Sequence, residues 1–363
     1  MTSKYSISPE IKKATTLPSS FYRDKDSFIA NTELLLSASW QFLGDTSLFD
    51  DNHNVVPMVI YEDLIDEPVI LIRAQDGSIK CLSNVCTHRG NLLINQPGKI
   101  SHLVCGYHGR KYSLEGKFES MPEFEGVEDF PRICDHLQQI GFGQWHQFYF
   151  ASLDQKLPFT DIAKDLNERL GFFDISSFKY APENDKSYRI RAHWALYCDN
   201  YLEGFHIPFV HPGLNQAVEY TSYETILYKY CSLQIGYAKK GVEAFNLPEG
   251  HPDYGKKIAA YYYWIFPNLM FNFYPWGLSI NIVNPKGPEE TEVIFKSYVA
   301  DATKLNRSAG AGLDEVEMED EAVVESVQKG MKSRFYNTGR FSPTKEKGVH
   351  HFHSLIDKFL SEK

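Results

Sequence analysis

Short runs of apolar and polar residues, broken by turn-forming residues, fill two long stretches of the chain. Residues 39–153 contain such runs, with glycine-containing turns between them, and this pattern is typical of strands. Residues 222–300 are again rich in β-branched and aromatic residues. A helical period is clear in 313–336, and an arm followed by a helix fills 1–44. The pattern predicts a β-rich module of about 110 residues inserted near the N-terminus of a larger α+β domain.

One apolar stretch, residues 259–284, contains no charged residue and is long enough for a membrane span. It is interrupted by polar and helix-breaking residues, namely Pro267, Asn268, Asn272, Pro275, Gly277 and Asn281. Its content of Tyr, Trp, Phe and Ile favours paired strands over a lipid-facing helix. We therefore expect this stretch to form the core of a sheet and not to enter a membrane.

Composition and charge narrow the class of protein. The net charge of −10 opposes nonspecific binding to nucleic-acid phosphates. The opening residues, MTSKYSISPEIKKATT, lack the apolar core of a secretory signal. Six cysteines in a chain of 363 residues do not form a disulfide scaffold. We expect a cytoplasmic, reducing location in which some thiols serve as metal ligands.

Cys86, His88, Cys105 and His108 form two short ligand pairs, in the segments CTHRG and CGYHG. Thiolates and imidazoles on two loops can converge on one metal site. A Cys2His2 zinc site is one interpretation, and a Rieske [2Fe–2S] cluster is the other. Zinc fingers group two cysteines and then two histidines, whereas here each loop supplies one of each. The pattern favours the cluster, because each of its two irons needs a ligand from each loop.

Glu203, His206 and His211 form a second group, E-x2-H-x4-H, within DNYLEGFHIPFVH. Glu203 and His206 are three residues apart, so they share a face if the segment is helical. His206 and His211 are about 140° out of phase on a regular helix, but Pro208 cannot sustain an ordinary helical ladder. We expect the helix to distort or end here, which lets both imidazoles meet one metal. Asn200 is a candidate to lie near that metal, or else a polar residue at a helix N-terminus.

Asp320 is the candidate carboxylate for the facial triad of two histidines and one acid in non-heme Fe(II) oxygenases. The helix LDEVEMEDEAVVESVQKGM carries an apolar stripe made of Leu313, Val316, Val323, Val324, Val327 and Met331. At about 100° per residue Asp320 falls in the middle of this stripe. Glu319 and Glu321 fall outside it, and Glu317 lies at its edge. An unpaired buried carboxylate is very costly, so a metal ion or a salt bridge must compensate Asp320.

These motifs resemble those of the Rieske non-heme iron oxygenases, the aromatic-ring-hydroxylating dioxygenase alpha-subunit superfamily. One departure is that Gly106 and Arg110 stand where the family commonly has a proline and a tryptophan. The resemblance points to the choline monooxygenase-like, quaternary-ammonium oxygenase subgroup, which has Glu at the position of Glu203 where many aromatic-ring dioxygenases have Asp. It covers most of the chain, including TLPSSFY, FPNLMFNFYPWGLSINIV, ESVQKG, SRFYNTGRFSP and GVHHFH.

The resemblance implies a fold, a set of sites and partners. The fold is α+β, with a β-rich Rieske domain (45–155) inserted into a helix-grip-like catalytic domain with a large antiparallel sheet (156–363), to which the arm and helix of 1–44 belong. The implied ligands are Cys86, His88, Cys105 and His108 for the [2Fe–2S] cluster and His206, His211 and Asp320 for a mononuclear Fe(II). Glu203 is implied to connect the iron site to the Rieske histidine of a neighbouring subunit, in a homotrimer. O2 is the implied co-substrate.

Electrons must come from outside, because no G-x-G-x-x-G fingerprint for a nicotinamide cofactor follows a strand. We expect NAD(P)H to supply them through a separate reductase, with or without a ferredoxin. Three functions remain open. The first is oxidation of a quaternary ammonium compound such as choline, a betaine or carnitine. The second is hydroxylation of an aromatic or other apolar substrate, by monooxygenation or dioxygenation. The third is electron transfer by the Rieske module alone, which the second group of ligands disfavours.

Two further groups of side chains have an ordinary structural interpretation. Aromatic residues gather in 261–276 and can form a cage for a trimethylammonium group. Alternation along a strand lets only about half of them face one side, and filling of the sheet core is the better interpretation of each. His350, His351 and His353 are interpreted as packing and hydrogen-bonding residues, because no nearby cysteine or carboxylate completes a metal site.

Overall fold

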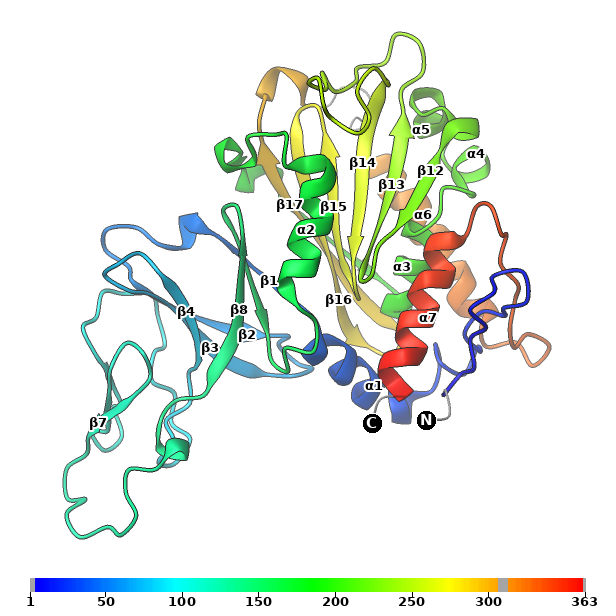
Figure 1. Ribbon diagram of the computed structural model, residues 1–363. Helices are drawn as coiled ribbons and strands as arrows, with labels where there is room; N and C mark the ends of the chain where they lie inside the picture. The colour runs from blue at the N-terminus through cyan, green and yellow to red at the C-terminus, as the bar shows by residue number, and fades with distance from the viewer. Residues whose placement is uncertain (1–3, 306–312, 362–363) are drawn as a thin grey trace. The chain divides into compact units, whose positions relative to one another are not determined.

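The structure is a computed structural model that describes residues 4–305 and 313–361 (Figure 1). Contacts divide the chain into two units, Met1–Leu36 with Leu157–Lys363, and Ser37–Lys156. The first limit lies earlier than the predicted 44/45, because strand β1 (Gln41–Asp45) pairs with β9 (Phe148–Ser152) inside the smaller unit. The smaller unit is therefore an insertion between two parts of the larger one.

The smaller unit contains a sheet of six antiparallel strands in the order β1-β9-β8-β4-β3-β2 and a sheet of three in the order β5-β6-β7. The remaining strands are β2 (Val55–Ile60), β3 (Glu67–Arg73), β4 (Ile79–Ser83), β5 (Leu103–Val104), β6 (Lys111–Tyr112), β7 (Phe118–Ser120) and β8 (Gln139–Trp145).

Strand β3 shows why the sequence of the smaller unit contains continuous apolar runs. Val69 and Leu71 pack into one hydrophobic cluster, and Ile70 and Ile72 pack into another. Successive side chains of a strand point to opposite faces, so both faces of the sheet are covered and the run is continuously apolar. The cluster around Ile70 also contains Cys86, Cys105 and Tyr112. The two cysteine-bearing loops are thus anchored on one face of the six-stranded sheet.

The larger unit is built on one antiparallel sheet in the order β10-β17-β16-β15-β14-β13-β12, with β11 also paired to β17. Its strands are β10 (Lys179–Tyr180), β11 (Lys186–Ile190), β12 (Glu224–Leu227), β13 (Cys231–Tyr237), β14 (Ile258–Ile265), β15 (Leu269–Tyr274), β16 (Gly277–Gly287) and β17 (Glu290–Val299). Every residue of β15 is buried, because both faces of the sheet are covered. The apolar stretch 259–284 is therefore sheet core, as predicted. No helix among the described residues is long and apolar enough to cross a membrane.

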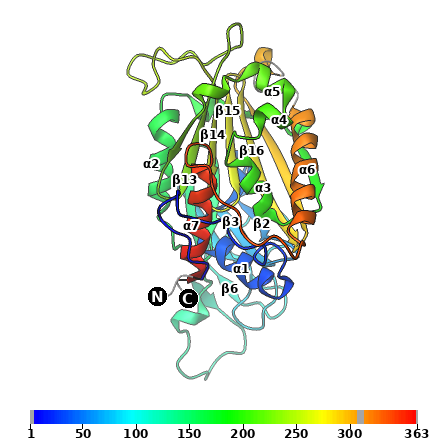
Figure 2. The same ribbon diagram turned by 90° about the vertical axis from the view of Figure 1, so that its right-hand side faces the viewer.

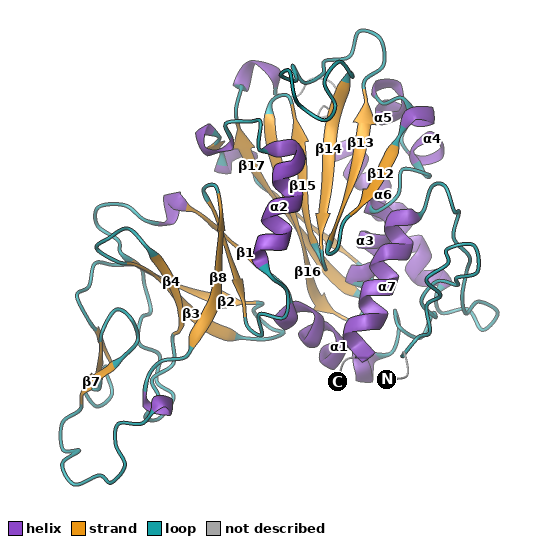
Figure 3. Cartoon of the chain, in the orientation of Figure 1, coloured by secondary structure: helices purple, strands orange, loops and turns teal. Residues whose placement is uncertain are grey.

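Helices lie on both sides of this sheet, and Figure 2 shows α2 and α6 on opposite sides of it. The helices, coloured purple in Figure 3, are α1 (Lys25–Ala38), α2 (Phe159–Leu170), α3 (Trp194–Tyr201), α4 (Ile207–Val210), α5 (Pro212–Ala217), α6 (Leu313–Gly330) and α7 (Lys347–Ser361). Helix α3 contacts both α6 and β16. The α3–α5 segment and α6 are thereby brought together, although more than a hundred residues separate α3 from α6.

Candidate metal centres

The two cysteine-bearing loops of the smaller unit have the same backbone design. The N–H of Cys86 donates to the carbonyl of Asn91 (2.9 Å), and the N–H of Cys105 donates to that of Arg110 (2.8 Å). In each loop a glycine N–H returns to the cysteine carbonyl at 3.0 Å, from Gly90 and from Gly109. Both glycines have positive φ, 72° and 71°, a conformation that other residues adopt at a cost. Each loop therefore presents one cysteine and one histidine in the same way.

The side chains of these loops suit metal ligation. Cys86 and Cys105 are buried, and the rings of His88 and His108 lie 4.8 Å apart between centroids. Burial raises the pKa of Cys105, but hydrogen bonds from the backbone of Tyr107 and from Cys86 outweigh it and lower that pKa overall, which favours the thiolate. The buried Nδ1 of His108 has no hydrogen-bond partner among the described residues. These observations fit a metal-bound state.

The spread of these four side chains bears on the choice between zinc and a cluster. One group of described residues has ligand atoms all within 4.8 Å of one another, and it is His206, His211 and Asp320. The four cysteine and histidine side chains form no such group in the part of the chain that is described. Ligands of one tetrahedral zinc ion lie about 2.0–2.3 Å from the metal and so within about 4 Å of each other. The wider arrangement fits a two-iron cluster better.

Arg110 occupies the position where the family commonly has tryptophan. Its guanidinium lies 4.9 Å from the ring centroid of Phe118 and 5.2 Å from that of Phe130, and it donates to a carboxylate oxygen of Asp135 at 2.9 Å. A planar cation can stack on aromatic faces and pair with an acid at the same time. Arg110 thus packs against the aromatic side chains below the second loop, and the four ligand positions are unaffected.

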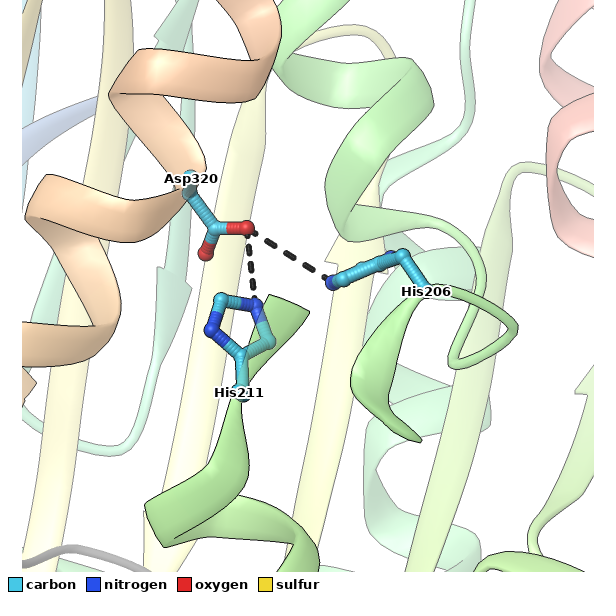
Figure 4. A group of neighbouring side chains, drawn as sticks. All are labelled: His206, His211 and Asp320. Atoms are coloured by element: carbon cyan, nitrogen blue, oxygen red, sulfur yellow. Dashed lines mark hydrogen bonds and ion pairs between the residues drawn. The ribbon is translucent and has the colours of Figure 1, made fainter. Parts of the chain in front are cut away.

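The larger unit brings His206, His211 and Asp320 together (Figure 4). Asp320 projects from α6, and its Oδ1 lies 3.0 Å from Nε2 of His211 and 3.6 Å from Nε2 of His206. The two imidazole rings are 5.0 Å apart between centroids. His211 is 1% exposed and the other two side chains about 15%, so the group is sheltered and still accessible from one side.

The chain path explains how the two histidines converge. Helix α3 ends at Tyr201, and His206 and His211 stand at the two ends of the one-turn helix α4, which contains Pro208. The predicted break in the helix is therefore present. The expectation that Glu203 and His206 share a helix face is wrong, because α3 has already ended. Instead the Glu203 carboxylate folds back and accepts hydrogen bonds from the backbone N–H of Phe205 and of His206.

Carboxylates fix the tautomers of both histidines. Nδ1 of His206 lies 2.7 Å from Glu203 and Nδ1 of His211 lies 2.7 Å from Glu319. Because an ionised carboxylate only accepts, each Nδ1 carries a proton, and Nε2 is the ring nitrogen left to bind a metal ion in place of a second proton. The two Nε2 atoms and Oδ1 of Asp320 face one another within 4.8 Å, where either a proton on His211 or a metal ion can balance the carboxylate. These residues therefore fit a metal ion.

Electrostatics give the same indication for His211. Burial lowers the pKa of His211, but the contacts with Asp320 and Glu319 outweigh burial and raise it. The site thus favours a positive charge at this ring. Asn200, in the last turn of α3, donates from Nδ2 to Oδ1 of Asp320 at 2.5 Å, so it lies at the site and not at a helix N-terminus.

Sequence reasoning missed Glu319, which it placed outside the apolar stripe of α6. Periodicity identifies side chains that point into the core, whereas Glu319 reaches His211 from the edge of that face, and its side chain is 29% exposed. Its neighbour Glu317, assigned to the edge of the stripe, is 4% exposed. The acidic residues next to Asp320 in the sequence were the available signal for Glu319, because metal-bound histidines commonly donate a hydrogen bond to a carboxylate.

A small cavity of about 110 Å³ adjoins the three ligands. Five of its lining residues are tyrosines, namely Tyr197, Tyr201, Tyr223, Tyr262 and Tyr274. Of the aromatic residues in 261–276, two line the cavity, and most of the others are buried in the sheet, as the alternation of a strand requires.

The three histidines near the C-terminus do not form a metal site in the described structure. All three lie in α7. His353 accepts from the N–H of Leu17 (3.0 Å) through Nδ1 and contacts Asp199 at 2.8 Å through Nε2, and His350 contacts the carbonyl of Ser8. Their predicted role in packing and hydrogen bonding agrees with these contacts.

Comparison with known proteins gives two family matches. The pattern of the ring hydroxylating alpha subunit (catalytic domain) matches residues 178–362, and that of the Rieske [2Fe-2S] domain matches residues 39–131. A chloroplastic choline monooxygenase of Arabidopsis thaliana is 28% identical over 95% of this chain and 83% of its own length. The carnitine monooxygenase oxygenase subunit of Escherichia coli K12 is 27% identical over 97% of this chain and 95% of its own.

Solved structures share the fold. A quaternary ammonium Rieske monooxygenase in complex with L-carnitine superimposes with a TM-score of 0.70 and 23% identity, covering 97% of this chain and 99% of that one. Naphthalene 1,2-dioxygenase from Rhodococcus sp. gives a TM-score of 0.71 at 19% identity, covering 95% and 94%. The architecture is thus common to proteins named for very different substrates, and the fold alone does not select one.

Proposed function

This chain belongs to the family of ring hydroxylating alpha subunits and carries a Rieske [2Fe–2S] domain, and on that premise we propose that it oxidises a small quaternary ammonium compound. It is the oxygenase component of a Rieske non-heme iron oxygenase, which uses O2 and externally supplied electrons. We propose hydroxylation or N-demethylation of a substrate of the choline, betaine or carnitine type. Relatives named for choline and for carnitine, similar over nearly the whole chain, support this proposal.

The observation that carries the proposal is the small cavity beside His206, His211 and Asp320. Tyr201, Tyr223, Tyr262 and Tyr274 line it, and tyrosine faces attract quaternary ammonium groups through cation–π interactions.

We assign the ligands as follows. Cys86 and Cys105 would hold one iron of the cluster, and His88 and His108 the other. His206, His211 and Asp320 would hold the mononuclear iron as a facial triad, beside the cavity that all three residues line. When bound, the iron supplies a place to activate O2 next to the substrate, with electrons delivered one at a time through the cluster.

The surrounding residues would position these ligands and connect the iron site to the Rieske cluster. Glu203 would hold the proton on Nδ1 of His206, and we propose that it also connects this site to the Rieske histidine of a neighbouring subunit in a homotrimer. Asn200 would restrain Asp320 by donating to Oδ1. In the overall reaction one oxygen atom enters the substrate, and the other leaves as water with two electrons and two protons. Attack on an N-methyl carbon would release formaldehyde.

Partners and location follow from this scheme. We propose that a separate reductase oxidises NAD(P)H and passes electrons to the Rieske domain, with a ferredoxin as an optional intermediate. We also propose a cytoplasmic location, which the free thiols of all six cysteines support.

The proposal is tested by turnover. Iron-loaded protein is supplied with NADH and a surrogate reductase, and O2 consumption, formaldehyde and substrate loss are measured for choline, glycine betaine, carnitine, toluene and indole. We expect substrate-dependent O2 consumption with an ammonium compound. Turnover of the aromatic compounds alone would contradict the proposed substrate class.

A further inference from the structure

Two buried hydrogen-bond acceptors in the wall of the cavity have no partner among the described residues. They are Oε1 of Glu317 and Oε1 of Gln234, and both residues line the cavity. Glu317 is 4% exposed and Gln234 is 1% exposed. Buried polar atoms are nearly always hydrogen-bonded in native proteins, so a ligand in the cavity is the natural partner of this pair.

The chemistry of both atoms is fixed by their neighbours. Nε2 of Gln234 donates to the backbone carbonyl of Tyr201 at 2.6 Å, and a carbonyl only accepts, so the outward-facing atom of the amide is its oxygen. The hydroxyl of Tyr197 donates to Oε2 of Glu317 at 2.7 Å, which holds that carboxylate in place and leaves Oε1 free. A protonated Glu317 would not resolve the deficit, because its new donor would also lack a partner.

The net charge of the residues around the cavity indicates which charge a bound ligand carries. Glu203, Glu317, Glu319 and Asp320 place four carboxylates in or beside the cavity, and one Fe(II) offsets two of them. Among the described residues that line the cavity, none is lysine or arginine. Burial, with smaller contributions from Asp320 and Glu321, raises the pKa of the Glu317 carboxyl to about 8, so its anion needs a positive charge beside it to be stable at neutral pH. A cation in the cavity would supply one.

We propose that Glu317 is the specificity-determining residue that selects the charge of the substrate, admitting a cation that carries no carboxylate. Within the proposed function, on which this inference rests, the substrate is then an ammonium alcohol and not a zwitterion such as a betaine or carnitine. The cationic head group, which has no N–H, lies against Glu317 and the tyrosines as a counter-ion, and the hydroxyl of the substrate's alcohol arm donates to Oε1 of Gln234. A substrate carboxylate would meet acidic walls with no cationic side chain to receive it.

The first test uses the wild-type holoenzyme and needs no variant. Isothermal titration calorimetry compares choline with 3,3-dimethyl-1-butanol, its uncharged carbon isostere, and with glycine betaine, which replaces the alcohol by a carboxylate. We expect choline to bind at least about tenfold more tightly than either, a difference of about 1.4 kcal/mol. Equal affinity for the isostere, or tighter binding of glycine betaine, would overturn the proposal.

The second test replaces the Glu317 carboxylate in the cavity wall by an uncharged amide. Glu317→Gln keeps the shape and the acceptor for Tyr197 but removes the charge, and Glu315→Gln makes the same change at an exposed position two residues earlier in α6. We expect choline to bind about 30-fold or more weakly to the Glu317 variant, the lower end of losses at desolvated charge pairs, with the affinity for 3,3-dimethyl-1-butanol unchanged. The Glu315 variant should match wild type. Unchanged choline affinity in a Glu317→Gln protein that retains its iron and its Rieske absorption refutes the inference.

Failure of this inference and failure of the proposed function give different results. If glycine betaine or carnitine binds best and Glu317→Gln has no effect, the proposed ammonium substrate class is retained and the proposed role of Glu317 is refuted. If no ammonium compound binds while indole or toluene does, the proposed function itself is wrong. Glu317→Asp adds a control, because it keeps the charge and should restore a preference for choline over its isostere.

Discussion

Replacement of Glu319 by Gln tests whether the carboxylate behind His211 matters to the iron site. In the wild-type protein Glu319 accepts a hydrogen bond from Nδ1 of His211 at 2.7 Å, and the histidine is 1% exposed. A hydrogen bond to a charged group contributes about 1.5–3 kcal/mol, and loss of such a partner typically weakens metal binding about 10–100-fold. We expect the dissociation constant for mononuclear Fe(II) to rise by that factor.

The assay is competition for iron with a chelator under anaerobic conditions, with acid-labile sulfide measured on the same samples. Sulfide should stay at the wild-type level, because the Rieske ligands lie in the other unit. The exposed Glu315→Gln variant provides the control for a lost charge on α6. An iron affinity of Glu319→Gln within twofold of wild type would show that the carboxylate does not support His211, and the tautomer argument would then fail.

Three further predictions concern the triad, the sheet and the acid side of the stability profile. Asp320→Ala should abolish turnover while the visible absorption of the Rieske cluster persists; turnover at the wild-type rate would remove Asp320 from the triad. Gly277→Ala should lower the free energy of unfolding by about 3 kcal/mol or more, because Gly277 has a φ of +149° and an added Cβ would lie 2.1 Å from the carbonyl oxygen of Tyr298; an unchanged melting temperature would contradict this. His193 caps α3 by accepting from the N–H of Ala195, and burial lowers its pKa to about 3. Below about pH 6.5 this histidine is protonated in the unfolded chain but stays neutral in the folded protein. The free energy of unfolding therefore falls as the pH drops from 6.5 toward 3, by up to about 1.4 kcal/mol per pH unit. His193→Asn keeps a helix cap but removes this titration. In urea unfolding, the difference in free energy of unfolding between wild type and the variant should therefore narrow by about 2 kcal/mol between pH 7 and pH 5. A constant difference would show that His193 does not titrate on unfolding.

Much of the site could be predicted because its chemistry is written in short motifs. Cys86 with His88 and Cys105 with His108 are separated by one or two residues, so a single loop fixes each pair. Asp320 is remote in sequence, and the period of α6 identified it as an acid on an inward-facing position. The structure brings Asp320 to the histidines, but its role as a ligand remains a proposal.

What sequence reasoning could not supply depends on contacts between distant segments. Glu319 lies off the centre of the helix face, and its contact with His211 joins two residues that are 108 positions apart in the chain. Glu203 was expected on a helix, yet α3 ends at Tyr201, and a carboxylate that folds back onto its own backbone has no periodic signature. The domain limit was placed at 44/45, inside the strand Gln41–Asp45, because the partner of that strand, Phe148–Ser152, lies more than a hundred residues later.

The central claim is that one chain carries both a Rieske cluster and a separate mononuclear iron. Iron and acid-labile sulfide are measured per chain on anaerobically purified protein, and an EPR spectrum is recorded after reduction with dithionite. The account predicts about three irons and two sulfides per chain, with a Rieske-type signal. Zinc in place of iron, without sulfide, would contradict the assignment of Cys86, His88, Cys105 and His108 and the proposed function with it.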